Sequence, residues 1–250
     1  MPLSARVGFF ASTGFTPKSI AGLGMWWDAS VASSVTLNGS TVSQWRDLSG
    51  NGRHLNQSSA ASQPTYTTSA RNGLNALTMG TNGTDMFTGS GTSGDATMFT
   101  VTSQSIFWAI VSPTAQNIQA RVYTQFVTGQ TNDFSGTNYM IPPYFPAANQ
   151  CAVYAAGSVR NAINFTAGTA LVMSFVHNGT TASSRLNRGT ATTSNFTLNT
   201  AINIARIGNG PNTTRGTLCE VIVYNNVALS ETDRTTVERY LANKWAIAVA

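Results

Sequence analysis

The sequence predicts an all-β protein, built as two packed antiparallel sheets with one helix near the C-terminal end. Eight short runs of apolar, β-branched and aromatic residues follow one another between turn signals, as strands do. Several Asn-Gly pairs, which favour the type I′ turn of a β-hairpin, separate such runs. A helical period begins only after residue 230. The predicted strands are 42–45, 76–79, 105–111, 122–127, 150–154, 170–177, 201–207 and 218–224, and the pairs include those at Asn38, Asn51, Asn72, Asn82 and Asn178.

The run at 218–224 is central to this prediction. It is apolar almost throughout, which is typical of a strand buried on both faces, so we expect it in the middle of a sheet. A helix follows it. Ser230 is placed to cap that helix, with Asp233 three positions later in the capping-box arrangement.

The predicted helix has one apolar face and one polar face. Residues that recur at spacings of three and four form the apolar face, and they are Val237, Tyr240, Leu241 and Trp245. We expect Glu238, Arg239 and Asn243 to face water.

The composition of the chain limits the size of its core and the kinds of partner that it can bind. The chain has 250 residues, of which 42% are hydrophobic, enough for the core of one domain. Only 9% of the residues are charged, against about 25% in typical domains, so hydroxyls, amides and glycine must provide the polar surface. The net charge of +5 comes largely from single arginines along the chain, with no basic run between aromatic residues. This pattern argues against a nucleic-acid groove.

The cysteines and the first residues of the chain bear on the cellular compartment of the protein. Cys151 and Cys219 lie in apolar, strand-like runs, so buried free thiols are favoured over a disulfide, and the pairing stays open. The first ten residues lack the features of a secretory signal, and no apolar run approaches the ~20 residues that span a membrane. We therefore expect a protein that is made in the cytoplasm and does not insert into a membrane.

Residues 1–22 are predicted to form an N-terminal arm ahead of a single domain at 23–250. Apart from Val7, Phe9 and Phe10, the first half of this arm is small and polar. Two interpretations stay open. The arm is either a frayed or edge-paired terminus, or a docking segment that adds a strand to a partner.

Motifs at both ends of the domain resemble a known family. The sequence carries WWDAS at 26–30, VSQWRDLSGNGRH at 42–54, QPTY at 63–66, EVIVY at 220–224, ALS at 228–230 and YLANKW at 240–245. These motifs resemble the opening and the end of laminin-G-like modules of the concanavalin A-like lectin/glucanase superfamily. Such modules occur in bacteriophage virion proteins and bacterial surface proteins. The resemblance implies a jelly-roll sandwich whose function is set by its loops.

Catalytic residues are not evident from the sequence. Glycoside hydrolysis usually needs two carboxyl groups about 5–10 Å apart, and the run at 218–224 offers Glu220 alone. We interpret Glu220 as a buried, hydrogen-bonded carboxylate or the partner of an arginine. His54 and His177 belong to no recognisable triad. The sequence therefore predicts a protein that is not an enzyme.

No cofactor or metal site is assigned. Asp85, Asp95 and Asp133 fall in turn-like stretches, and a calcium site would have to be drawn from them. None of them shows the dense Asp-x-Asp spacing of a strong calcium loop, so the sequence gives calcium little support.

The best candidate for ligand binding is the stretch 129–149, the longest one without a clear strand pattern. Aromatic rings stack on the apolar faces of sugars, while amides and carboxylates bind the hydroxyls. Asp133, Asn138, Tyr139 and Tyr144 supply both kinds of group. The alternative is that the aromatic residues cover the sandwich or fill an oligomer interface.

Two functional hypotheses follow. The first is a non-enzymatic structural protein of a bacteriophage particle, a capsid decoration or tail fibre component on the virion surface. Its partners would be other virion proteins, bound through residues 1–22, with a homo-oligomer as a further expectation. The alternative is a lectin-like adhesin module that recognises a neutral cell-surface carbohydrate through residues 129–149.

Overall fold

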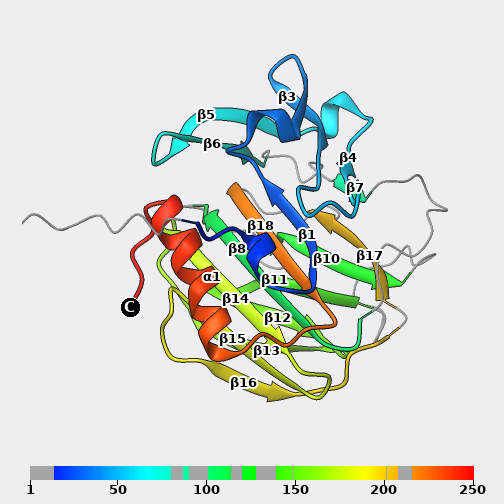
Figure 1. Cartoon of the computed structure of the whole chain (residues 1–250), viewed down its shortest axis with the longest axis vertical. Helices are drawn as coiled ribbons and strands as arrows, with labels where there is room; N and C mark the ends of the chain where they lie inside the picture. Colours follow the sequence, from blue (N-terminus) through cyan, green and yellow to red (C-terminus); the bar gives the residue numbers. More distant parts are fainter. Residues whose placement is uncertain are drawn as a thin grey trace, which may run out of the picture.

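The computed structural model describes residues 14–79, 87–89, 101–113, 120–127, 139–147, 149–200, 202–207 and 216–250. Within these ranges the chain is mostly strand (Figure 1). The strands are β1 (Leu23–Asp28), β2 (Val35–Asn38), β3 (Thr41–Trp45), β4 (Leu55–Asn56), β5 (Thr65–Arg71), β6 (Leu74–Thr78), β7 (Phe87–Gly89), β8 (Gln104–Val111), β9 (Ala120–Arg121), β10 (Tyr123–Val127), β11 (Tyr139–Ala147), β12 (Gln150–Ala155), β13 (Ser158–Asn164), β14 (Ala170–His177), β15 (Thr181–Leu186), β16 (Thr192–Asn195), β17 (Ile202–Ile207) and β18 (Thr217–Asn225). The helices are the 3-10 turns η1 (Pro17–Ser19), η2 (Ala32–Ser34) and η3 (Ala60–Ser62), and α1 (Glu231–Lys244).

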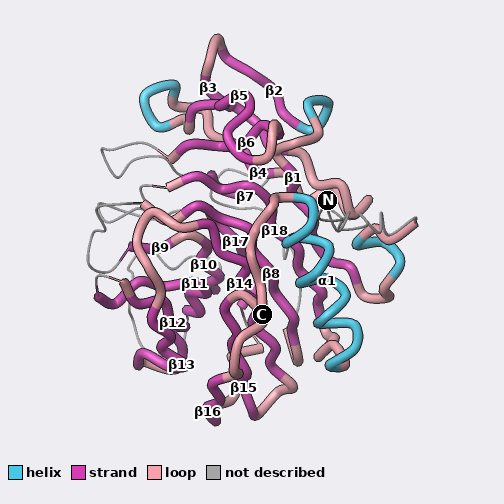
Figure 2. The backbone as a smooth tube through the Cα atoms, turned by 90° about the vertical axis from the view of Figure 1, so that its left-hand side faces the viewer, coloured by secondary structure: helices cyan, strands magenta, loops and turns pink. Residues whose placement is uncertain are grey.

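Twelve of these strands form two antiparallel layers that pack face to face. Strands β2–β6 pair with one another and join the two layers through β6–β18 and β4–β7, and β9 pairs with β11. One sheet has the order β1-β18-β8-β14-β15-β16, and α1 covers its outer face. The other has the order β7-β17-β10-β11-β12-β13. Figure 2 shows α1 and the two sheets as successive layers. The predicted all-β sandwich with one C-terminal helix is confirmed.

Strand β18, which contains the predicted run 218–224, lies inside its sheet as the sequence predicts. β18 pairs with β1 on one side and β8 on the other. Val221 and Val223 contribute to the core between the sheets, whereas Ile222 and Tyr224 contribute to the core under α1. Because side chains alternate along a strand, Glu220 lies on the same face as Ile222, toward the helix. Each of the other seven predicted runs also overlaps an observed strand.

The tryptophans and cysteines occupy the cores, as expected. Trp27, Trp45, Trp108 and Trp245 are completely or almost completely buried, and Trp26 is half-buried. Both thiols are free and buried, Cys151 between the sheets and Cys219 under α1, so the prediction of free thiols is confirmed. Burial raises the pKa of each thiol to about 12, which makes both unreactive near neutral pH.

Helix α1 begins as the capping pattern predicts. The Ser230 hydroxyl accepts a hydrogen bond from the Asp233 amide at 3.1 Å and donates one to the Asp233 carboxylate at 2.8 Å. The apolar face predicted from the spacing packs on the sheet, with its last member, Trp245, immediately after the helix. The expectation that Glu238 faces water is wrong, because Glu238 is 1% exposed and lies against Arg234.

Two expectations about turns are corrected. Among the described Asn-Gly pairs, only Asn72-Gly73 has both residues at positive φ, the geometry of a type I′ hairpin. The stretch 129–149 is not all loop, because its second half forms strand β11. The prolines of β11 fall where its register with β12 is irregular, between Ile141 and Ala147. A proline lacks the amide that a regular ladder needs, and these irregular positions do not require it.

The described part of the predicted arm, residues 14–22, lies against the α1 side of the sheet. The Tyr224 hydroxyl donates a hydrogen bond to the Pro17 carbonyl at 2.9 Å, and the ring of Phe15 meets that of Tyr240 edge-on at 5.5 Å. Residues 1–13 lie outside the described residues, so a docking role for the arm stays a prediction.

Candidate functional site

Glu220 is a fully hydrogen-bonded carboxylate beneath helix α1. Its two oxygens accept hydrogen bonds from Trp26 Nε1 at 2.7 Å, Tyr240 Oη at 2.9 Å, Lys244 Nζ at 2.8 Å and Trp245 Nε1 at 2.8 Å. The residue is fully buried. A carboxylate with four donors and no contact with solvent cannot reach a substrate, so Glu220 is structural. The predicted buried, hydrogen-bonded role is confirmed, with a lysine rather than an arginine as the charged partner.

Asp28 shares Lys244 with Glu220, which creates a buried cluster of two carboxylates and one cation. The Lys244 ammonium bonds Asp28 Oδ2, and Asp28 Oδ1 accepts from the Ser30 amide at 2.9 Å. Burial and the charge of Asp28 raise the pKa of Glu220, an effect that Lys244 partly opposes. The cluster ties β1 and β18 to the end of α1.

Asp47 organises the turn that carries the 42–54 motif. Its carboxylate accepts from the amides of Trp26, Ser49 and Arg53 at 2.8–3.0 Å, and its own amide donates to His54 Nδ1 at 3.0 Å. The motif that carried the family resemblance is therefore a folding element. Neither Asp47 nor His54 is placed for catalysis.

A second buried ionic cluster lies between α1 and the strands β14 and β15. Arg234 Nε lies 3.2 Å from Glu238 Oε1 and donates to Ser174 Oγ at 2.9 Å. Arg185 and Arg188 approach the other carboxylate oxygen of Glu238 at 3.6 and 4.0 Å. The sequence could not reveal this cluster, because Arg234 of α1 lies 60 positions from Ser174 and 51 from Ser183.

The described part of the chain therefore shows no solvent-facing pair of carboxylates suited to acid–base chemistry. Its acidic residues are engaged in the clusters above, in helix capping or in a surface ion pair, and they are Asp28, Asp47, Glu220, Glu231, Asp233 and Glu238. No group of three His, Cys, Asp or Glu residues that could hold a metal ion occurs in the described ranges. Asp85, Asp95 and Asp133 lie outside those ranges.

The structure places the predicted ligand-binding residues only in part. Asp133 and Asn138 lie outside the described residues. Tyr139 and Tyr144 have described backbones in β11, where Tyr139 pairs with Phe126 of β10 and Tyr144 pairs with Ala152 of β12. These two tyrosines thus sit on one strand of the second sheet, and their ligand-binding role stays a prediction.

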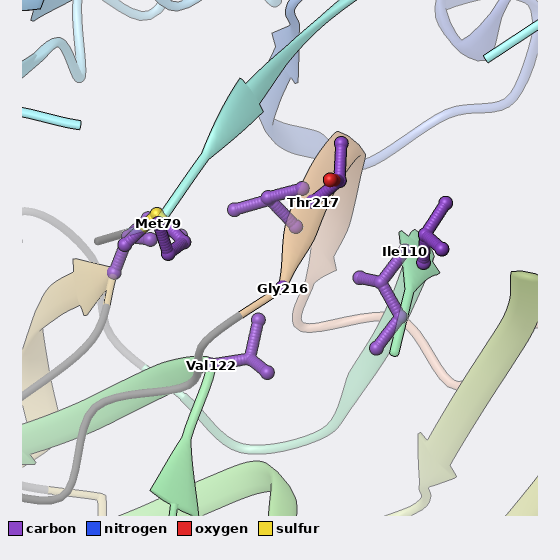
Figure 3. Close-up of a pocket in the computed structure, with 8 residues that line it drawn as sticks. Met79, Ile110, Val122, Gly216 and Thr217 are labelled. Atoms are coloured by element: carbon purple, nitrogen blue, oxygen red, sulfur yellow. The ribbon is translucent and has the colours of Figure 1, made fainter. Parts of the chain in front are cut away.

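Two cavities between the sheets are too small for a ligand. Figure 3 shows one, where Met79, Ile110 and Val122 gather around the backbone of Gly216. Its volume is about 10 Å³, and a second cavity beside Trp108 and Cys151 is of the same size. That is about the room that one water needs.

An open groove of about 750 Å³ lies at one end of the sandwich. Its walls are the 164–169 turn between β13 and β14, the turn that follows β15, Arg71 of the β5–β6 hairpin, and residues 248–250 after α1. This groove could not be predicted from the sequence. Asn164-Phe165-Thr166 does combine an aromatic ring with amide and hydroxyl groups, but nothing local shows that Asn187 and Arg71 lie beside it.

His177 is buried at the end of β14 with both ring nitrogens engaged. Nδ1 accepts from the Gly179 amide at 2.8 Å, and Nε2 lies 2.8 Å from the Phe196 carbonyl, to which it donates. Burial lowers the pKa of His177, although the bond to Phe196 partly opposes this shift. The ring is held neutral because a proton on Nδ1 would displace the Gly179 amide.

We expect this arrangement to destabilise the protein in mild acid. The unfolded chain takes up a proton on His177 near pH 6.5, whereas the folded chain does so only at lower pH, so the free energy of unfolding falls as pH drops below about 6.5. The slope contributed is at most about 1.4 kcal/mol per pH unit. Urea denaturation at pH 7.5 and pH 5 should show this loss in the wild type and a smaller one in His177→Asn. Equal losses in the two proteins would contradict the assignment.

The fold resembles solved glycosidases. A Trypanosoma rangeli sialidase matches with a TM-score of 0.59 and 12% identity, covering 91% of this chain and 34% of its own. A GH54 α-L-arabinofuranosidase matches with a TM-score of 0.58 and 13% identity, covering 83% of this chain and 52% of its own. This chain thus spans about a third of the sialidase and about half of the arabinofuranosidase. No protein-family model matches the sequence, and no curated protein sequence does.

These matches correct the functional expectations. The similar structures are carbohydrate-processing enzymes, which overturns the hypothesis of a non-enzymatic bacteriophage particle protein and the expectation that the chain is not an enzyme. At 12–13% identity the likeness establishes the fold.

None of the helices in the described ranges is both long and apolar enough to cross a membrane.

Proposed function

We propose that this chain is a carbohydrate-binding domain of the concanavalin A-like, jelly-roll type, acting within a carbohydrate-processing protein. The observation that carries the proposal is the match of 83–91% of the chain to a sialidase and an arabinofuranosidase. An arabinofuranosidase complexed with arabinofuranosyl-α-1,2-xylobiose also matches, with a TM-score of 0.55. Three matches to sugar-processing proteins favour a sugar as the ligand, although a shared fold alone supports a function only by analogy.

The geometry favours recognition as the contribution of the described residues. Their carboxylates are committed to folding contacts, whereas the groove at the end of the sandwich is open and lined by polar groups. Any acid–base chemistry of the chain itself would have to draw on Asp85, Asp95 and Asp133. The predicted contacts of Asp133, Asn138, Tyr139 and Tyr144 with a glycan belong to this proposal.

A glycan array probed with the purified chain tests the proposal. We expect binding to a subset of glycans, and Tyr144→Ala should weaken it at least about 10-fold, or about 1.4 kcal/mol, if β11 carries the contact. Leu37→Ala is the control, because Leu37 is 49% exposed on β2 and should leave binding unchanged.

The same preparation should be incubated with a panel of aryl glycosides that includes 4-nitrophenyl α-L-arabinofuranoside. Release of nitrophenol would assign the processing step to this chain. An empty array together with no hydrolysis would overturn the proposed function.

A further inference from the structure

The groove at the end of the sandwich combines apolar residues with a few polar side chains, among which Asn164, Asn187 and Arg71 carry hydrogen-bond donors. Asn187 Oδ1 is occupied by the Val172 amide at 2.8 Å, which leaves its Nδ2 group available. Asn164 Oδ1 likewise accepts from Gln150 Nε2 at 3.4 Å, so the Asn164 amide also presents its NH₂ group. Among the described residues, none accepts a hydrogen bond from either NH₂ group. A ligand rich in oxygen acceptors would satisfy both.

Arg71 gives the groove a positive charge. Its Nε donates to the Trp245 carbonyl at 2.8 Å, and its Nη2 donates to the Ala246 carbonyl. Both partners are neutral, and within the described ranges Arg71 forms no ion pair. No acidic side chain lines the groove. A guanidinium held by neutral carbonyls, in a groove that no acidic side chain lines, favours an anionic group on the ligand.

The walls of the groove are fixed before any ligand binds. The 164–169 turn is closed by hydrogen bonds from Thr169 to the Thr166 carbonyl at 3.3 Å and from Gly168 to the Pro113 carbonyl at 3.2 Å. The C-terminal segment is joined to the opposite wall by the bond from the Ala250 amide to the Asn187 carbonyl at 2.9 Å. Figure 2 shows the C-terminus beside β14 and β15. A preformed site loses little ordering entropy on binding.

Phe165 adds apolar surface to these polar groups. Its half-buried ring lines the groove and meets Phe145 edge-on, with the ring centres 5.6 Å apart. Sugar-binding sites need this combination, because a pyranose ring presents CH groups on its faces and hydroxyls around its edge. The volume of about 750 Å³ also falls in the range of small-molecule sites.

We propose that this groove binds an acidic glycan, with Arg71 pairing with a sugar carboxylate while Asn164 and Asn187 donate to neighbouring oxygens. The inference rests on the proposed function for the nature of the ligand, but its site differs from the residues predicted on the 129–149 stretch. It also replaces the neutral glycan of the earlier expectation with a charged one.

Isothermal titration of the full chain with trigalacturonate, and with galactotriose as the neutral match, tests this inference. We expect trigalacturonate to bind at least about 10-fold more tightly and to lose affinity as salt is added. Ala248→Trp should abolish binding, since Ala248 is exposed and lines the groove. The matched control is Ala61→Trp, an exposed alanine on η3 outside the groove, which should bind as the wild type does.

Arg71→Gln tests the charge. It should remove most of the preference for trigalacturonate, and thermal unfolding reports whether the lost bonds to the helix end also weaken the fold. Wild-type affinity in Ala248→Trp, or equal affinity for the two sugars, would overturn the groove proposal. If array binding is lost in Tyr144→Ala but kept in Ala248→Trp, the proposed function stands and the groove is excluded. If the array, the aryl glycosides and the titration are all negative, both proposals fail.

Discussion

Replacing Glu220 by alanine is expected to lower the free energy of unfolding by about 3–5 kcal/mol. The change leaves the indole N–H groups of Trp26 and Trp245 without their acceptor, and both belong to the core under α1. It also removes one of the two carboxylates that neutralise Lys244. Relief of the repulsion between Glu220 and Asp28 offsets part of this cost, so we expect a value in the lower half of that range. Urea denaturation followed by tryptophan fluorescence measures it.

Glu231→Ala, at the start of helix α1, is the control. The Glu231 side chain is 64% exposed and pairs with Arg185 at 2.6 Å. An exposed ion pair contributes about 0–1 kcal/mol, so this variant should be close to the wild type in stability. Similar losses in the two glutamate variants would show that the Glu220 contacts contribute little more than a surface pair.

The sequence predicted those parts of the fold that depend on neighbouring residues. Strand β18 and its helix could be recognised because an apolar run and a capping serine with Asp233 are local patterns. The partners of Glu220 could not, because Trp26 lies 194 positions away from it. Glu238 was misassigned for the same reason. Arg234, four positions before Glu238, is a local partner. Only the fold brings Ser174, 64 positions away, to Glu238 and buries the pair against β14.

The resemblance to a known family predicted the fold better than the function. Asp47 holds a turn, Trp27 and Trp245 fill the cores, and Lys244 neutralises two buried carboxylates. These contacts stabilise the sandwich and do not depend on what its surface binds. The groove has no comparable signal in the sequence, because it forms only when the 164–169 turn, Asn187, Arg71 and the C-terminal segment meet.

Arg234 is expected to matter as much as Glu220. It is 3% exposed, and its guanidinium bonds Ser174, Ser183 and Glu238. Replacing Arg234 by methionine keeps the apolar packing of its stem but leaves Glu238 buried without its nearest cation. Breaking a buried ion pair in this way costs about 3–5 kcal/mol, and denaturation in urea should report a loss of that size.

The double variant Arg234→Met, Glu238→Leu separates the charge from the packing. With both ions replaced by apolar side chains, no buried carboxylate remains in this cluster, and Arg185 keeps its pair with Glu231. The double variant should therefore be more stable than the sum of the single losses predicts, by up to about 3 kcal/mol in a double-mutant cycle. Additive losses would contradict the coupling, since they would mean that each ion is stabilised without the other. A double variant as stable as the wild type would show that the cluster contributes little to net stability, because its attraction mainly offsets the cost of burying both charges.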